Sequence, residues 1–246
     1  LISDSVGSGT DGMLNLLIRD KTAVMALERE YENYLELCRP LMQIYNAESA
    51  ESCIASFLKF ERQPGDLLIA HSLPSAFSLP QGVVRSFREY DSNPVLSNYF
   101  NKSYAAFREH MRNGDGITEI LYLPEPKRIS ADNIAVPMCD LFGIPELKLS
   151  PEILRLHLKN VIRLLKKEPL YQVTLTRQIP ENISLQVKEG YGAILSHAAP
   201  PTTAFVTNEF NMTAAFREFL IKIREETLYK TKEVVIRQLE TYISKL

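Results

Sequence analysis

The hydrophobic positions of this chain follow a seven-residue repeat in its N-terminal part. The repeat has two apolar columns, which consist of Leu17, Val24, Tyr31, Cys38 and Tyr45 and of Met13, Leu27, Tyr34 and Leu41, with Asp20 as the one polar interruption. Such a recurrence keeps one stripe of a helix turned toward the same partner, as in coiled coils. It predicts a helix of roughly thirty residues that bends or ends near Pro40. This helix either docks on another chain or covers the core of its own domain.

The pattern after this helix alternates between helical and strand-like segments. Helices are expected at 48–60, 81–90, 95–112, 151–167, 211–226 and 230–245, and strands at 67–70, 117–123, 134–138, 171–176, 183–188, 192–197 and 203–207. The helix at 151–167 has the clearest ends, since Ser150 can cap it and Pro151 suits its first position. Long helices interspersed with strands predict an α/β fold in which helices flank a mixed sheet.

The chain is expected to have two parts. Residues 1–46 form a linker rich in glycine and serine and then the long docking or dimerisation helix, whereas residues 47–246 form an α/β effector domain of the sensor type. The first residue is Leu1 rather than a methionine, which indicates a fragment of a longer protein.

Composition and charge argue against several classes of protein. Hydrophobic residues make up 45% of the chain and charged residues 24%, and the net charge is −2, which is ordinary for a globular protein and gives no electrostatic basis for nucleic-acid binding. Cys38, Cys53 and Cys139 are odd in number and scattered, which favours reduced thiols in a cytoplasmic protein and no metal site. No apolar run in the sequence is long enough to span a membrane.

The segment from Gly7 to Gly12 matches the GxGxxG pattern of dinucleotide-binding loops. That fold requires a second strand that ends in an acidic residue about twenty residues further on. Here residues 23–38 continue as the predicted helix, so Glu30 and Glu32 lie on a helix surface. The segment is therefore interpreted as part of a flexible linker, and no cofactor is expected.

The sequence motifs of hydrolytic enzymes are incomplete in this chain. His157 and Lys159 match the first half of the phospholipase-D signature HxKxxxxD, but Leu164 stands where the acid is required. Ser-His-Asp, Cys-His and paired-carboxylate arrangements have no local support, and the four histidines are not at metal-ligand spacing. We therefore expect no enzymatic activity.

Three residues are candidates for a ligand site. His71 and His197 each end a predicted strand, and Arg177 follows another one. Ligands of open α/β sheets gather at strand ends. A guanidinium suits carboxylates and phosphates, so a small anionic ligand is expected at Arg177, with His71 and His197 as further contacts. A structural role is the alternative for each histidine.

The segment from Ile183 to Phe219 has the order strand, turn, strand, strand, helix, with the runs Gly192–His197, Thr203–Thr207 and Asn211–Phe219. It resembles the end of the effector half of bacterial helix-turn-helix transcriptional regulators, and Glu30–Met42 is similar to the helix that enters that half. The resemblance implies an α/β sensor domain, in some families of phospholipase-D-like fold without catalytic residues. It also implies a DNA-binding domain, which is expected upstream of Leu1 because no such module is evident here.

The sequence as a whole predicts a cytoplasmic regulatory domain that senses a ligand or dimerises. It would self-associate through the N-terminal helix and reach DNA only through the upstream domain, while a ligand would shift the population of two arrangements of the helix pair. Two alternatives stay open. One is a small α/β enzyme with a site assembled from distant residues such as His71, Arg177 and His197, and the other is a non-catalytic protein-interaction domain.

Overall fold

The computed structural model describes residues 18–38, 42–73, 75–85, 90–130, 136–144, 150–227 and 231–246. The chain divides into two units, Leu1–Leu41 and Met42–Leu246. The predicted boundary lies after residue 46, whereas the structure places Met42–Tyr45 in the sheet of the second unit. The GxGxxG segment lies outside the described residues, as do Met13, Leu17 and Leu41 of the predicted helix.

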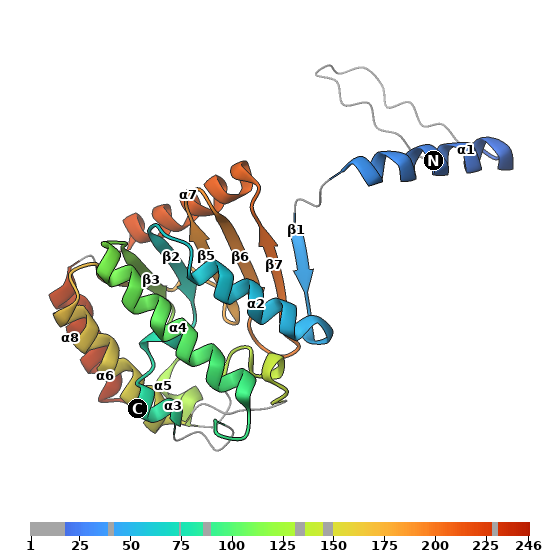
Figure 1. The fold of residues 1–246 in the computed structure, drawn as a ribbon. Coiled ribbons are helices and arrows are strands. Elements are labelled where there is room, and N and C mark those ends of the chain that lie inside the picture. Colours follow the sequence, from blue (N-terminus) through green and yellow to red (C-terminus); the bar gives the residue numbers. More distant parts are fainter. Residues whose placement is uncertain are drawn as a thin grey trace. The chain divides into compact units, whose positions relative to one another are not determined.

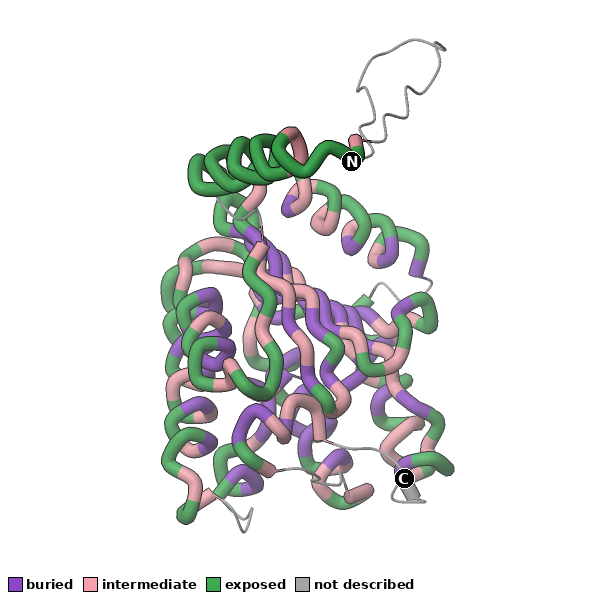
Figure 2. The backbone as a smooth tube through the Cα atoms, turned by 90° about the vertical axis from the view of Figure 1, so that its right-hand side faces the viewer, coloured by how far each residue is buried: buried purple, intermediate pink, exposed green. Residues whose placement is uncertain are grey.

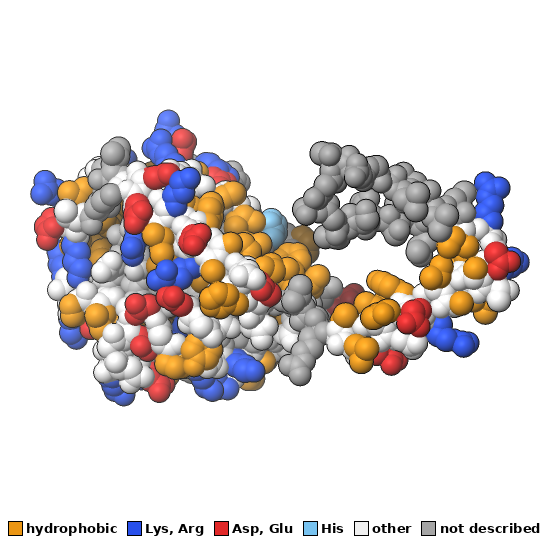
Figure 3. Space-filling model, turned by 90° about the horizontal axis from the view of Figure 1, so that it is seen from above, with side chains coloured by type: hydrophobic (Ala, Val, Ile, Leu, Met, Phe, Trp, Pro, Cys, Tyr) orange, Lys and Arg blue, Asp and Glu red, His pale blue; other side chains and the backbone are white. Residues whose placement is uncertain are grey.

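The described part of the first unit is the helix α1 (Lys21–Leu37). Its first turn is capped by Asp20, whose side chain accepts a hydrogen bond from the amide of Ala23 at 2.8 Å. None of its residues is buried, and Figure 2 shows the helix as exposed along most of its length. The side chains of Met25, Tyr31 and Tyr34 are each more than 60% exposed, and Figure 3 shows hydrophobic side chains on this helix beside charged ones. The described helix therefore lies within the segment predicted to be helical.

The second unit is built on one mixed sheet, which confirms the predicted fold class (Figure 1). Its strands are β1 (Met42–Tyr45), β2 (Leu67–His71), β3 (Ile117–Leu121), β4 (Tyr171–Leu175), β5 (Ile183–Lys188), β6 (Gly192–His197) and β7 (Thr203–Thr207). Their order in the sheet is β1-β7-β6-β5-β2-β3-β4. Strands β2, β3 and β4 run parallel, and all other neighbours are antiparallel.

Helices cover both faces of this sheet. They are α2 (Ala50–Glu61), α3 (Gln81–Arg85), α4 (Pro94–Asn113), α5 (Pro126–Ser130), α6 (Pro151–Lys167), α7 (Phe210–Glu226) and α8 (Lys232–Ile243), joined by the 3-10 turns η1 (Ala47–Ser49), η2 (Ala76–Ser78) and η3 (Cys139–Phe142). Figure 1 shows α7 behind the sheet, with α2 and α4 in front of it and α6 beside α8. The larger core lies on the side of α2, α4 and α6, and the smaller one lies between α7 and the central strands.

Local signals set most of these elements. Helix α6 begins where Ser150 accepts a hydrogen bond from the amide of Ile153, and α4 ends at Gly114, whose φ of 85° suits glycine. The prediction of a strand at 134–138 is wrong for residues 136–138, which form no strand. Met138 has a φ of 60°, which lies outside the range of a β-strand. No described helix combines the length and the apolar character that a membrane crossing requires.

Candidate functional site

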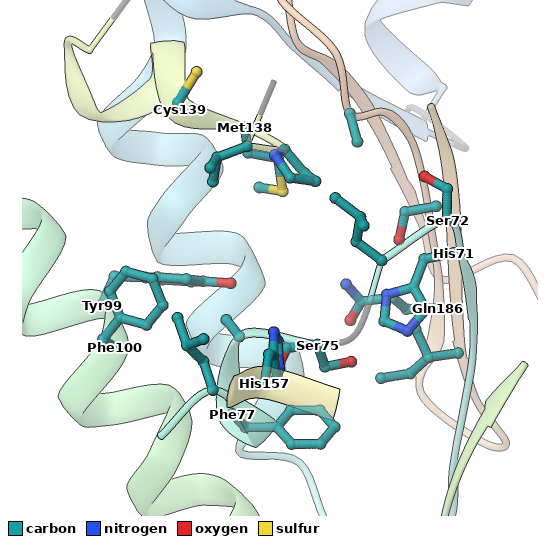
Figure 4. A pocket seen from close by; sticks show the side chains of 18 of the residues that line it. His71, Ser72, Ser75, Phe77, Tyr99, Phe100, Met138, Cys139, His157 and Gln186 are labelled. Atoms are coloured by element: carbon teal, nitrogen blue, oxygen red, sulfur yellow. The ribbon is translucent and has the colours of Figure 1, made fainter. Parts of the chain in front are cut away.

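A cavity of about 160 Å³ lies in the second unit, on the side of the sheet that faces α2, α4 and α6. Most of the side chains around it are apolar and come from several elements: Leu67 and Ile69 of β2, Leu96, Tyr99 and Phe100 of α4, Ile153 and Leu154 of α6, and Phe142 of η3. Figure 4 shows Tyr99 and Phe100 on the α4 side and His71 and Gln186 on the sheet side. The cavity is thus an apolar space with a polar patch on one wall.

That polar patch comes from the alternation of side chains along β5. Leu185 and Val187 pack in the core under α7, so Ser184, Gln186 and Lys188 point to the opposite face, where the cavity lies. Both faces of β5 are covered by helices, so these three polar side chains lie inside the protein. The side chains of Ser184 and Gln186 make no hydrogen bond with another described residue, so they are available to a bound molecule.

His71 lies next to this row at the end of β2. The register pairs Ala70 with Leu185, so His71 and Ser184 occupy the next position of the two strands. The ring of His71 is held by Glu119 of β3, because its Nε2 lies 2.9 Å from the Glu119 Oε2. We call His71, Ser184 and Gln186 the sheet wall of the cavity.

Glu119 is completely buried, and its carboxylate is fully occupied by donors. The amide of Ser75 donates to Oε2 at 3.1 Å, and the hydroxyl of Tyr171 donates to Oε1 at 2.7 Å. Burial raises the pKa of Glu119, but the hydrogen bond and charge of His71, together with these donors, bring it below its ordinary value. A carboxylate only accepts hydrogen bonds, so His71 donates from Nε2 and its Nδ1 is the acceptor when the ring is neutral.

A second histidine forms hydrogen bonds with the segment around η2, which also lines the cavity. His157 of α6 is buried, with its Nε2 at 2.8 Å from the Ser78 hydroxyl and 3.2 Å from the Ser75 carbonyl. Burial lowers the pKa of His157 to about 4, so its ring is neutral. Lys159 is exposed and Leu164 is in the core, so the partial phospholipase-D motif brings no acid to this histidine.

The other end of the cavity is formed by Glu61, the last residue of α2. Its Oε2 is buried without a hydrogen-bond partner among the described residues, and burial raises the pKa of Glu61 to about 7. Lys188 caps the same helix end, since its Nζ lies 3.0 Å from the Glu61 carbonyl and also donates to the carbonyl of Gln63. The Nζ also lies 2.9 Å from the Nε2 of His110. Burial lowers the pKa of Lys188 to about 8.

The structure does not bring the three predicted ligand residues together. Only His71 lines the cavity. His197 shares the face of Leu195 on β6, which packs toward α7, so it lies on the opposite side of the sheet and is exposed. Arg177 follows the edge strand β4, which β3 separates from β2, and it is exposed as well.

Sequence reasoning missed Glu61, Glu119, His157, Ser184 and Gln186 as site residues. One signal was present, because Glu119 is a charged residue inside the apolar run of β3. Among the residues that the structure describes, no three His, Cys, Asp or Glu side chains group as a metal site.

The comparisons with known proteins concern the fold. No family model and no curated protein matches the chain. Among solved structures, NucT from Helicobacter pylori has a TM-score of 0.39 at 10% identity, over 76% of this chain and 96% of its own. TrmBL2, an archaeal chromatin protein with a novel mode of DNA binding, has a TM-score of 0.40 at 10% identity. This second match covers 84% of the chain and 64% of TrmBL2, so the chain spans less than two thirds of that protein.

One expectation is corrected by these comparisons. The sequence predicted a chain without enzymatic activity, but NucT, which shares this distant likeness, is a phospholipase-D-like nuclease. The likeness assigns no activity to this chain.

Proposed function

We propose that residues 42–246 are the small-molecule-sensing part of a transcriptional regulator and that the cavity is the ligand site. The observation that carries the proposal is an apolar cavity with a few unpaired polar groups gathered on one wall. This combination is typical of small-molecule sites, in which the apolar lining supplies affinity and the polar groups fix orientation. Contact with DNA would be made by a module outside residues 42–246.

The size of the cavity limits the ligand. An apolar cavity of about 150 Å³ in another protein holds a benzene molecule. The cavity measured here, at about 160 Å³, has room for a body of that size. A polar substituent of the ligand would reach Ser184 and Gln186 of the sheet wall, which have no other described partner.

The regulatory part of the proposal concerns α1. Its exposed side chains include Tyr31 and Tyr34 at seven-residue-repeat positions, and only residues 38–41 separate α1 from β1. We expect α1 to pair with α1 of a second copy, because its apolar stripe buries nothing within the described unit. A ligand would then act by shifting the population of two arrangements of this pair.

Calorimetry with benzyl alcohol tests the ligand site. We expect saturable binding that weakens about tenfold in His71→Gln, because one hydrogen bond to the ligand is lost. His197→Gln is the matched control, since it makes the same change on the opposite, exposed face. Ala198→Phe should abolish binding by filling the cavity. Unchanged binding in both His71→Gln and Ala198→Phe would show that the alcohol binds elsewhere.

General-base chemistry at His71 is a second candidate function. The observation in its favour is the hydrogen bond between His71 and Glu119. The Nε2–H of His71 donates to the Glu119 carboxylate, so in the neutral ring the other nitrogen, Nδ1, can act as a base beside the cavity. Hydrolysis of phenyl acetate tests it. A water attacks the carbonyl carbon and transfers a proton to Nδ1; the bond from that carbon to the phenolic oxygen then breaks, and the leaving phenolate takes the proton from Nδ1 to give phenol and acetic acid. Turnover that His71→Gln abolishes and His197→Gln leaves intact would support this function, and equal rates in both variants would exclude it.

A further inference from the structure

The charges around the cavity do not suit the anionic ligand expected from the sequence. The described residues that line it include no lysine and no arginine, and their one carboxylate is Glu61. Its two histidines add no unpaired positive charge, since burial keeps His157 neutral and a charge on His71 is paired with the Glu119 carboxylate. An anion placed here would lose its hydration without gaining a cationic partner.

We infer that the ligand carries an ammonium group, which binds to Glu61 at the α2 end of the cavity while its apolar body fills the remainder. This inference rests on the proposed function and names the ligand class for the same site.

The first support is the state of the Glu61 carboxylate. Glu61 is 7% exposed and lines the cavity. Hydrogen bonding by the Ser103 and Tyr99 hydroxyls and the charge of Lys188 lower the pKa of its carboxyl, but burial outweighs them and raises that pKa to about 7. An ammonium group in the cavity would supply a further donor and a compensating charge to this carboxylate.

Lys188 does not fill this role, although it lies nearby. Its Nζ has three described partners, namely the carbonyls of Glu61 and Gln63 and the Nε2 of His110. None of these described hydrogen bonds goes to the Glu61 carboxylate, on which Lys188 acts through its charge.

The aromatic side chains at the same end form the second support. Tyr99, Phe100 and Phe142 line the cavity, and the Tyr99 ring centroid lies 5.7 Å from that of Phe100 and 5.3 Å from that of Phe142. Burial, and then the charge of and a hydrogen bond with Glu61, raise the pKa of Tyr99. Aromatic faces attract ammonium groups, most strongly where water is excluded.

The second buried carboxylate provides an internal comparison. Both oxygens of Glu119 are taken by His71, Ser75 and Tyr171, so that carboxylate has no free position for a ligand. Glu61 is 7% exposed and lines the cavity, and its donors leave the pKa of its carboxyl raised to about 7. The cation site therefore belongs to the α2 end and not to the sheet wall.

Three probes of nearly equal size test this inference, namely benzylamine, benzyl alcohol and benzoate. At about pH 8, where Glu61 is ionised, we expect benzylamine to bind at least about tenfold more tightly than benzyl alcohol, and benzoate most weakly. The preference for the amine should vanish in Glu61→Gln. Glu51→Gln is the matched control, because it removes an exposed carboxylate from the same helix and should keep the preference.

The pH profile of the unaltered protein gives a second measurement that needs no variant. Tyr99 and His110 on α4 and Lys188 on β5 face Glu61, and they act on the amine and the alcohol in the same site. The ratio of the two affinities isolates the ligand charge, and we expect it to rise between about pH 6 and about pH 8 as Glu61 ionises.

The outcomes separate the two proposals. Benzyl alcohol binding without a preference for benzylamine would overturn the inferred ligand class and leave the cavity as a ligand site. A preference for benzylamine that persists in Glu61→Gln, or a ratio independent of pH, would also overturn it. If none of the three probes binds, both proposals fail.

Discussion

Two buried groups of the cavity, Glu61 and His157, make opposite contributions to stability as the pH changes. Burial raises the pKa of Glu61 from 4.5 to about 7, so the folded protein holds a proton that the unfolded chain releases between these values. Stability from this group is fully present below about pH 4.5 and is lost as the pH rises toward about 7. Burial lowers the pKa of His157 from 6.5 to about 4, so the unfolded chain binds a proton there that the folded protein does not. Its contribution is present above about pH 6.5 and is lost as the pH falls.

The magnitudes are similar. One proton of difference corresponds to about 1.4 kcal/mol per pH unit. Between about pH 5 and about pH 6.5 each group approaches this limit, with a negative slope for Glu61 and a positive slope for His157. We therefore expect the free energy of unfolding of the unaltered protein to be nearly flat in this window. The flatness results from cancellation rather than from an absence of titration.

Single variants should separate the pH dependence that Glu61 and His157 each give to the free energy of unfolding. In Glu61→Gln the free energy of unfolding should rise by about 1 kcal/mol per pH unit, because His157 then titrates alone. In His157→Gln it should fall by about the same amount. Urea unfolding at several pH values measures both slopes, and the slope is informative even if a variant is less stable throughout. Glu51→Gln provides the baseline, since Glu51 is exposed. Parallel, flat profiles in all three variants would refute the argument.

Three further predictions concern other parts of the chain. Val24→Asp combined with Tyr31→Asp should convert a dimer to a monomer in sedimentation, and an unaltered protein that is already monomeric at high micromolar concentration would contradict pairing through α1. Gly192→Ala should destabilise by more than about 3 kcal/mol in urea unfolding, since the new Cβ would lie 2.2 Å from a backbone oxygen at a φ of 144°. Gly190→Ala, at a φ of 80° in open space, should cost only about 1 kcal/mol, and equal losses would refute the steric cause. NAD and FAD should produce no thermal shift, whereas a shift that Gly9→Val removes would reverse the linker interpretation.

Elements with strong local signals could be predicted from the sequence. Helix α6 runs from Pro151 to Lys167, as predicted, because its start is fixed by a capping serine and a proline and its end by two lysines and Pro169. The strand at Met42–Tyr45 could not be predicted in this way. Tyr45 continues the seven-residue column, and the strand forms only because it pairs with β7, more than 150 residues further along the chain.

The site was predicted only in part, because its members are far apart in sequence. The rule that ligands gather at strand ends led to His71, which does line the cavity, but it led equally to His197 on the wrong face. The alternation of β5 was visible in the sequence and identified a strand correctly. Whether its polar or apolar face is turned toward the cavity depends on the helices packed on each side, and no local pattern contains that information.

Glu61 and Glu119 show why burial alone does not identify a functional carboxylate. Both side chains are removed from solvent, yet the pKa of Glu61 is raised and that of Glu119 is lowered. The difference lies in the balance between burial and donors. The charge and hydrogen bond of His71, with Tyr171 and Ser75, outweigh the burial of Glu119, whereas Ser103, Lys188 and Tyr99 only partly offset the burial of Glu61. A carboxylate that the protein satisfies by itself stabilises the fold as an anion, here by orienting His71. A carboxylate that the protein leaves unsatisfied must either hold a proton or bind a cation, and its position beside aromatic rings in a cavity favours an ammonium ligand.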